Sequence, residues 1–129
     1  MHNIYVPEKD WTDARFQKLC KLCNQIIAYT NDLYGYEKEL FEQNGDLSKI
    51  FINLVAYYEI NDKCTLYEAM LKTRKVIVDM EEEISQLSDV FLADTTVAED
   101  SKVFIKCLHD MIGANYINSI TLSRYNNIY

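Results

Sequence analysis

Hydrophobic residues recur every three, four or seven positions between Asp10 and about Gln43. This spacing is the period of an α-helix with one apolar face, so the pattern predicts one unusually long amphipathic helix over this range. Residues 1–9 lack the pattern and are expected to be extended, ending around Pro7. Asn44-Gly45-Asp46 consists of residue types that accept a left-handed helix cap, and it is expected to end the long helix.

The pattern predicts further helices after this break. A second helix is expected from about Leu47 to Tyr58, and Asn61-Asp62-Lys63 interrupts the pattern behind it. Thr65-Leu66-Tyr67-Glu68 has the spacing of a capping box, in which a hydroxyl and a carboxylate satisfy the first free backbone N–H groups of a helix. We therefore expect a third helix from this point to about Leu87 or Phe91.

Thr96-Val97-Ala98-Glu99 repeats the capping-box spacing and is expected to open a fourth helix that reaches toward Leu122. Gly113 inside this helix is unfavourable relative to Ala by about 1 kcal/mol, and we interpret it as a point of close packing. The sequence thus predicts an all-α helical bundle of four helices in a single unit.

Composition supports helices and limits the partners. Of the 129 residues only one is Pro and three are Gly, which is too few for a sheet protein with many tight turns. The net charge of −7 and the lack of Lys and Arg clusters argue against nucleic acid as a partner. No apolar stretch approaches the ~20 residues of a membrane span, and the N-terminus has no secretory-signal pattern. A cytoplasmic protein without a membrane span is expected.

The cysteines offer a redox or zinc motif that the rest of the sequence does not complete. Cys20 and Cys23 have CxxC spacing, but they lie inside the long helical pattern without a second pair. His2 and His109 do not have the usual ligand spacing for completing a zinc site. We therefore expect free thiols in a reducing compartment at all four positions. These positions are Cys20, Cys23, Cys64 and Cys107.

Asn31, Gly35 and Glu39 lie four residues apart, so on a helix they share one face. Helical side chains lean toward the N-terminus, so Glu39 reaches back toward Asn31 across the notch that Gly35 leaves. An amide oxygen and a carboxylate are hard ligands that suit Mg²⁺ better than zinc or copper. Lys38 beside Glu39 suggests a polyanionic ligand, although the same residues on an exposed helix would ordinarily just be solvated.

A rival acidic segment is Asp79-Met80-Glu81-Glu82-Glu83. Asp79 shares a helix face with Glu82 or Glu83, which is an arrangement that can bind a divalent cation. Lys72, Arg74 and Lys75 precede the segment by one or two turns and provide ordinary i, i+4 ion pairs. We interpret the segment as a solvated charged face.

Ser123-Arg124-Tyr125 lies where the last helix is expected to fray. Arg124 there has two interpretations. A cation at a helix C-terminus is favourable because it faces the negative end of the helix dipole. Alternatively, the guanidinium binds two phosphate oxygens at once, with the Tyr125 hydroxyl beside it.

These segments together resemble a known family. Asn31-Asp32-Leu33-x-Gly35-x-x-Lys38-Glu39 resembles the second metal-binding motif of class I terpene synthases, (N/D)D(L/I/V)x(S/T)xxxE. Further segments are similar to ones that follow in the same order in that family, and the resemblance covers roughly residues 7 to 125. These segments are Asn53-Leu54-Val55, Thr65-Leu66-Tyr67-Glu68-Ala69, Gly113-Ala114-Asn115 and Arg124-Tyr125.

The resemblance implies an all-α bundle that corresponds to the C-terminal half of a class I terpenoid synthase barrel. It also implies three Mg²⁺ ions and a prenyl diphosphate substrate, with geranyl or farnesyl diphosphate expected. Such an enzyme is a lyase that removes diphosphate and lets the allylic carbocation cyclise or rearrange against an aromatic-lined pocket. The implied metal site is Asn31, Gly35 and Glu39, and the implied diphosphate contacts are Lys38, Arg124 and Tyr125.

Two departures from the family pattern change the expectation. Gly35 stands where the family has Ser or Thr, so one ligand oxygen is missing and a water is expected to replace it. The aspartate-rich motif that holds the other two metals should precede Asn31, and the thirty residues before Asn31 contain no DDxxD pattern. Residues 1–129 are thus expected to be the C-terminal part of a terpene synthase domain without its aspartate-rich N-terminal half, and inactive alone.

A chain of this kind is a fragment, one half of a split enzyme, or a decayed copy. The alternative from another functional class is a non-catalytic helical interaction module. A half-barrel exposes a broad apolar surface, and such surfaces drive association with a partner. The expected partner is the missing N-terminal half or a second copy of the chain.

Overall fold

The computed structural model of the chain describes residues 3–42 and 53–126. This part of the chain contains helices and no strand, so the prediction of an all-α fold is confirmed. None of these helices is both long and apolar enough to cross a bilayer. In chain order they are α1 (Glu8–Trp11), α2 (Ala14–Glu42), α3 (Leu54–Asn61), α4 (Leu66–Ala93) and α5 (Glu99–Asn126).

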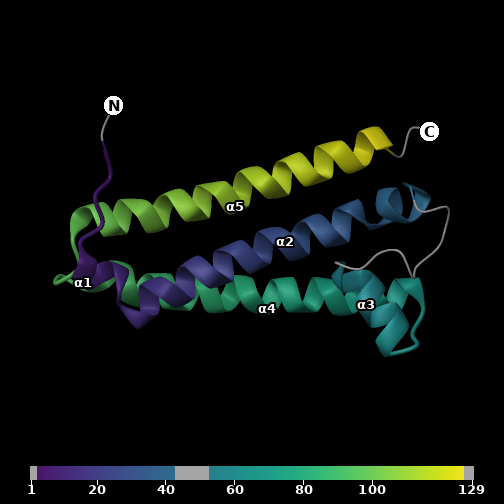
Figure 1. Cartoon of the computed structure of the whole chain (residues 1–129), viewed down its shortest axis with the longest axis horizontal. Coiled ribbons are helices and arrows are strands. Elements are labelled where there is room, and N and C mark those ends of the chain that lie inside the picture. Colours follow the sequence, from purple (N-terminus) through teal and green to yellow (C-terminus); the bar gives the residue numbers. More distant parts are fainter. Residues whose placement is uncertain (1–2, 43–52, 127–129) are drawn as a thin grey trace.

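The three long helices α2, α4 and α5 lie side by side (Figure 1). α2 and α5 run in the same direction and α4 runs in the opposite direction, so α2 and α5 end at the same end of the molecule. α3 lies near the C-terminal ends of α2 and α5, and α1 lies near their N-terminal ends (Figure 1). α2 packs extensively against both α4 and α5, whereas α4 and α5 hardly meet, so α2 is the central helix.

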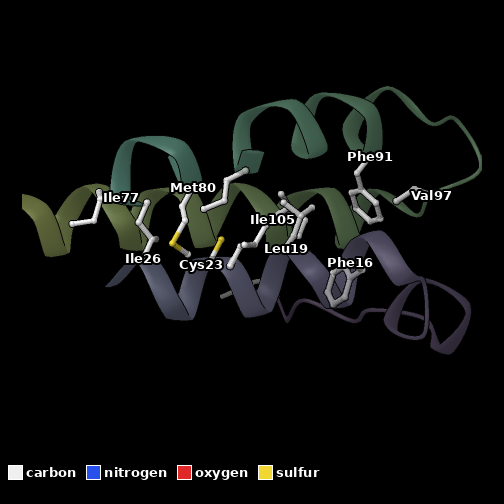
Figure 2. Close-up of a cluster of buried hydrophobic side chains, with 11 residues drawn as sticks. Phe16, Leu19, Cys23, Ile26, Ile77, Met80, Phe91, Val97 and Ile105 are labelled. Atoms are coloured by element: carbon white, nitrogen blue, oxygen red, sulfur yellow. The ribbon is translucent and has the colours of Figure 1, made fainter. Parts of the chain in front are cut away.

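The main core lies where the apolar stripe of α2 meets α4 and α5. Phe16 near the start of α2 packs against the rings of Phe91 in α4 and Phe104 in α5, with centroid distances of 5.8 and 5.4 Å. Further buried side chains continue this contact toward the other end of the molecule (Figure 2). They are Leu19, Leu22, Cys23 and Ile26 from α2, Ile77, Met80 and Ile84 from α4, and Ile105 from α5.

The long first helix begins later than predicted. A separate short helix, α1, occupies Glu8–Trp11, so the predictions of an extended stretch to residue 9 and one continuous helix from Asp10 are wrong there. Asp13 causes the interruption, because its carboxylate accepts a hydrogen bond from the backbone N–H of Arg15 at 2.8 Å. An acidic side chain that binds the first free N–H groups starts a new helix.

The second predicted helix is shorter than expected. Its predicted first residues, 47–52, lie outside the described part of the chain, and so does the predicted stop at residues 44–46. Asn53 is extended, with φ −149° and ψ 123°, and its side chain accepts hydrogen bonds from the N–H groups of Val55 and Ala56. Asn53 therefore caps α3, which runs to Asn61, and the prediction of a helix through Asn53 is wrong. The break at residues 61–63 is confirmed, and Lys63 has a positive φ of 49°.

The two predicted capping boxes have different outcomes. Thr65 caps α4 as predicted, because its Oγ1 accepts a hydrogen bond from the N–H of Glu68 at 3.2 Å. Thr96 does not cap α5, since its hydroxyl and N–H both bond to Asp94 and the helix begins only at Glu99. Gly113 is exposed with open space around it, so its interpretation as a point of close packing is wrong.

Asp10 of α1 takes over the capping of α5. This carboxylate is buried, and its Oδ2 accepts hydrogen bonds from the Ala98 N–H at 2.9 Å and the Ser101 hydroxyl at 2.7 Å. Burial alone raises the pKa of Asp10, but these hydrogen bonds and the nearby Lys9 outweigh it, so the pKa lies below its usual value. One side chain therefore fixes the start of α5 against α1.

We expect Asp10→Asn to lower the free energy of unfolding by about 1–3 kcal/mol at pH 7, because charge-assisted hydrogen bonds to a buried group are lost. Since the folded pKa of Asp10 is below the unfolded value of about 3.9, its stabilisation is complete above that pH and is lost as pH falls through the folded pKa. Urea unfolding at pH 7 and between pH 4 and 2 measures both effects. Asp110→Asn, at an exposed position of α5, is the control. Equal stability of the two variants at pH 7 would contradict the capping role.

Candidate metal and diphosphate site

Asn31 lies at the contact between α2 and α5. Its side chain is exposed, and its Oδ1 accepts a hydrogen bond from the hydroxyl of Ser119 in α5 at 3.3 Å. One turn further along α2, Tyr34 packs edge-on against Tyr116 of α5, with ring centroids 5.8 Å apart and hydroxyl oxygens 3.4 Å apart. Burial first, and then the bond to Tyr116, raise the pKa of Tyr34 to about 12. Asn31 is thus open to solvent but next to a second helix.

The other predicted site residues lie toward the shared end of α2 and α5. Gly35 is partly buried and Lys38 is exposed, and both follow Asn31 along one side of α2. Glu39 in α2 and both Arg124 and Tyr125 in α5 are helical, but their side chains lie outside the described part of the chain. α2 and α5 end at the same end of the molecule, so their backbones carry these residues there together (Figure 1).

Asp32, the second residue of the motif, joins α2 to α3. Its carboxylate accepts a hydrogen bond from the Leu54 N–H at 2.9 Å, and its backbone carbonyl accepts one from the Asn53 side chain at 3.1 Å. Tyr36 is buried, and its hydroxyl donates a hydrogen bond to the carboxylate of Glu59 in α3. Burial is the larger cause and this hydrogen bond the smaller cause of a Tyr36 pKa well above its usual range. Sequence reasoning missed this connection. Asn53 could have indicated a helix start at this point, because Asn is among the residue types that most favour the N-cap position.

A cavity of about 620 Å³ lies between α2 and α4, beside the contact of Tyr34 with Tyr116. Three tyrosines (Tyr34, Tyr67 and Tyr116) line it together with apolar side chains, and Arg74 and Glu81 of α4 add one charge of each sign. Its volume lies within the range of pockets for small ligands. The α4 lining residues recur every three or four positions, so their spacing was a signal in the sequence that could have indicated this shared face. The apolar lining comes from Leu33, Met70, Leu71, Ile77 and Val78.

The rival acidic segment of α4 is engaged in ordinary ion pairs. Asp79 pairs with Lys75 at 3.2 Å and Glu83 pairs with Lys18 at 2.7 Å, with all four side chains substantially exposed. This agrees with the interpretation of a solvated charged face. In residues 3–42 and 53–126, with side chains described through most of these ranges, no three His, Cys, Asp or Glu side chains form a metal-binding group.

All four cysteines are free thiols, as predicted. Cys23 is buried in the main core, and burial raises its pKa to about 11. A thiol with a raised pKa is mostly protonated near neutral pH and is a poor metal ligand or nucleophile. Cys20 and Cys23 therefore serve packing in α2 instead of forming a redox or zinc motif.

Comparison with known proteins identifies the family to which the chain belongs. The family model described as terpene synthase family 2, C-terminal metal binding, matches residues 1–83, which include the whole Asn31–Glu39 motif. Terpene cyclase 6 of Gibberella fujikuroi is 29% identical over 115 residues, which are 87% of this chain and 30% of that protein. The chain thus spans less than a third of the length of this relative, and no solved structure matches it. Because the family model covers more than half of the chain, the chain belongs to the terpene synthase family and corresponds to its C-terminal region.

Proposed function

We propose that this chain supplies a Mg²⁺- and diphosphate-binding part of a terpene synthase that ionises a prenyl diphosphate and guides the resulting carbocation to a cyclic or rearranged product. The observation that carries the proposal is the position of Asn31. The first residue of the family's metal-binding motif presents an exposed amide oxygen at the contact between two parallel helices, 3.3 Å from a second oxygen. Both helices continue from there toward the positions of Glu39 and Arg124.

The donor atoms suit magnesium. Asn31 and Ser119 offer neutral oxygens, and Glu39 adds a carboxylate by sequence. Mg²⁺ prefers oxygen ligands and is commonly held by one or two carboxylates together with substrate phosphates. In this proposal Asn31 and Glu39 hold one Mg²⁺, and Gly35 leaves the space beside it.

In the proposed chemistry, charged groups bind the diphosphate and the cavity holds the hydrocarbon part of the substrate. Bound Mg²⁺ would stabilise the negative charge that develops on the departing diphosphate. Lys38, Arg124 and Tyr125 bind the same group, and the planar guanidinium of Arg124 suits two phosphate oxygens. The hydrocarbon part of the substrate occupies the cavity between α2 and α4, where aromatic faces attract a cation. Tyr67, Leu71 and Val78 in this lining are exposed, so the exclusion of water that prevents premature capture of the cation requires a further cover over them.

A second candidate function rests on exposed apolar side chains. Tyr67, Leu71 and Val78 of α4 and Met111 and Ile117 of α5 each leave between 47% and 71% of their surface open. Exposed apolar side chains of this kind favour association with another polypeptide. A non-catalytic interaction module would show self-association or partner binding without any affinity for metal and diphosphate. Analytical ultracentrifugation of the chain, combined with the titration below, separates the two functions.

We expect Arg124→Lys to weaken binding of inorganic pyrophosphate by about tenfold or more, because lysine cannot bond two phosphate oxygens in a fixed fork. The melting temperature should hardly change, since either cation serves the helix C-terminus. Calorimetric titration of the chain with pyrophosphate in the presence of Mg²⁺ measures the affinity. Lys106→Arg, at an exposed position of α5, is the control. Unchanged affinity in Arg124→Lys would make Arg124 a helix-end charge and remove it from the proposed site.

The 129-residue chain by itself is expected to release no terpene from geranyl or farnesyl diphosphate with Mg²⁺. Its sequence offers one of the three metal sites that the family resemblance implies and contains no DDxxD pattern. Stabilisation of the leaving group depends on these charges acting together. Gas chromatography of extracts from the purified chain is the measurement. Terpene release above that of the Asn31→Ala variant would show that the chain is sufficient for the reaction.

A further inference from the structure

We infer that Ser119 of α5 supplies the hydroxyl ligand to Mg²⁺ that Gly35 cannot provide. The inference rests on the proposed metal site at Asn31 and Glu39, and it goes further by assigning a ligand outside the motif and on another helix. Where the family motif has Ser or Thr, this chain has a residue without a side chain. A hydroxyl from α5 lies next to the first residue of the same motif.

The distance between the two oxygens suits a shared ion. Mg²⁺ holds its ligands at 2.0–2.1 Å in an octahedron, so two adjacent ligand oxygens lie about 3 Å apart. Asn31 Oδ1 and Ser119 Oγ are 3.3 Å apart, so a shift of a few tenths of an ångström lets one ion contact both. The serine hydrogen, which points at the amide oxygen without metal, rotates away when the metal binds.

The surroundings of Ser119 favour this role over a purely internal contact. Asn31 is exposed and Ser119 partly exposed, so an ion from solvent reaches both oxygens. Thr121, two residues further, is different because its hydroxyl donates to the Ile117 carbonyl of its own helix at 2.9 Å. α5 also carries Arg124 five residues after Ser119, so the inferred metal ligand and the proposed diphosphate contact belong to the same part of one helix.

The experiment measures Mn²⁺, a paramagnetic substitute for Mg²⁺, bound to the chain together with inorganic pyrophosphate. Electron paramagnetic resonance gives its affinity, and deuterium modulation in D₂O counts its water ligands. We expect Ser119→Ala to lower the affinity roughly three- to tenfold and to add one water to the metal. Ser119→Thr should keep both values close to those of the unchanged chain. Thr121→Ala is the matched control, and it should change neither value.

A second substitution distinguishes a ligand from a structural contact. Gly35→Ser in the Ser119→Ala background restores a hydroxyl at the family position, so it should recover the affinity and remove the additional water. A serine that only holds α5 against α2 would not be replaced in this way. Circular dichroism and the melting temperature of each variant establish that it is folded. If Ser119→Ala loses affinity and Gly35→Ser fails to recover it in a folded protein, the inference is wrong.

The remaining outcomes separate the inference from the proposed function. If Asn31→Ala abolishes Mn²⁺ binding and Ser119→Ala changes neither affinity nor water count, the metal site stands and Ser119 is not a ligand. If the unchanged chain binds no Mn²⁺ in the presence of pyrophosphate, both the proposed metal site and the role of Ser119 are overturned. Recovery by Gly35→Ser is the result that supports the inference.

Discussion

The burial of one side of α2 between two other long helices is the constraint on which the rest of the structure depends. α2 is the helix that packs extensively against both α4 and α5, and those two hardly touch each other. The apolar stripe that begins at Phe16 and continues through Leu19, Cys23 and Ile26 forms these contacts. Because a helix is rigid, this packing also fixes the direction of its polar side, where Asn31 and Lys38 are exposed.

The helical period predicted the elements well because it is a local property of the sequence. The long stripe of α2 and the hydroxyl cap of α4 at Thr65 were both readable from spacing alone. Helix ends were less predictable where a distant group provides the cap. α5 starts at Glu99 because Asp10, 88 positions from Ala98, binds the free N–H there, and no local pattern records such a contact.

The candidate site, too, was predictable from local spacing only in part. The spacing of Asn31, Gly35 and Lys38 predicted that they lie along one side of a helix. The family resemblance identified this side as the implied metal and diphosphate site. The neighbours of Asn31 did not follow, because the register of α5 against α2 is set by packing over the whole length of both helices. Ser119 and Tyr116 reach α2 for that reason. The metal- and diphosphate-binding roles of the six predicted site residues all remain predictions: Asn31, Gly35, Lys38, Glu39, Arg124 and Tyr125.

The parallel course of α2 and α5 has an electrostatic consequence. Each helix carries a dipole equivalent to about half a negative charge at its C-terminus, and these two ends lie at the same end of the molecule, whereas α4 places its positive end there. Two negative ends against one positive end leave a net partial negative charge. In the sequence, the last turn of α2 contains Glu39 and Glu42 and no basic residue, whereas α5 carries Arg124 near its own C-terminus. The helix dipoles alone, before any side chain is counted, therefore favour a bound cation at this end of the molecule.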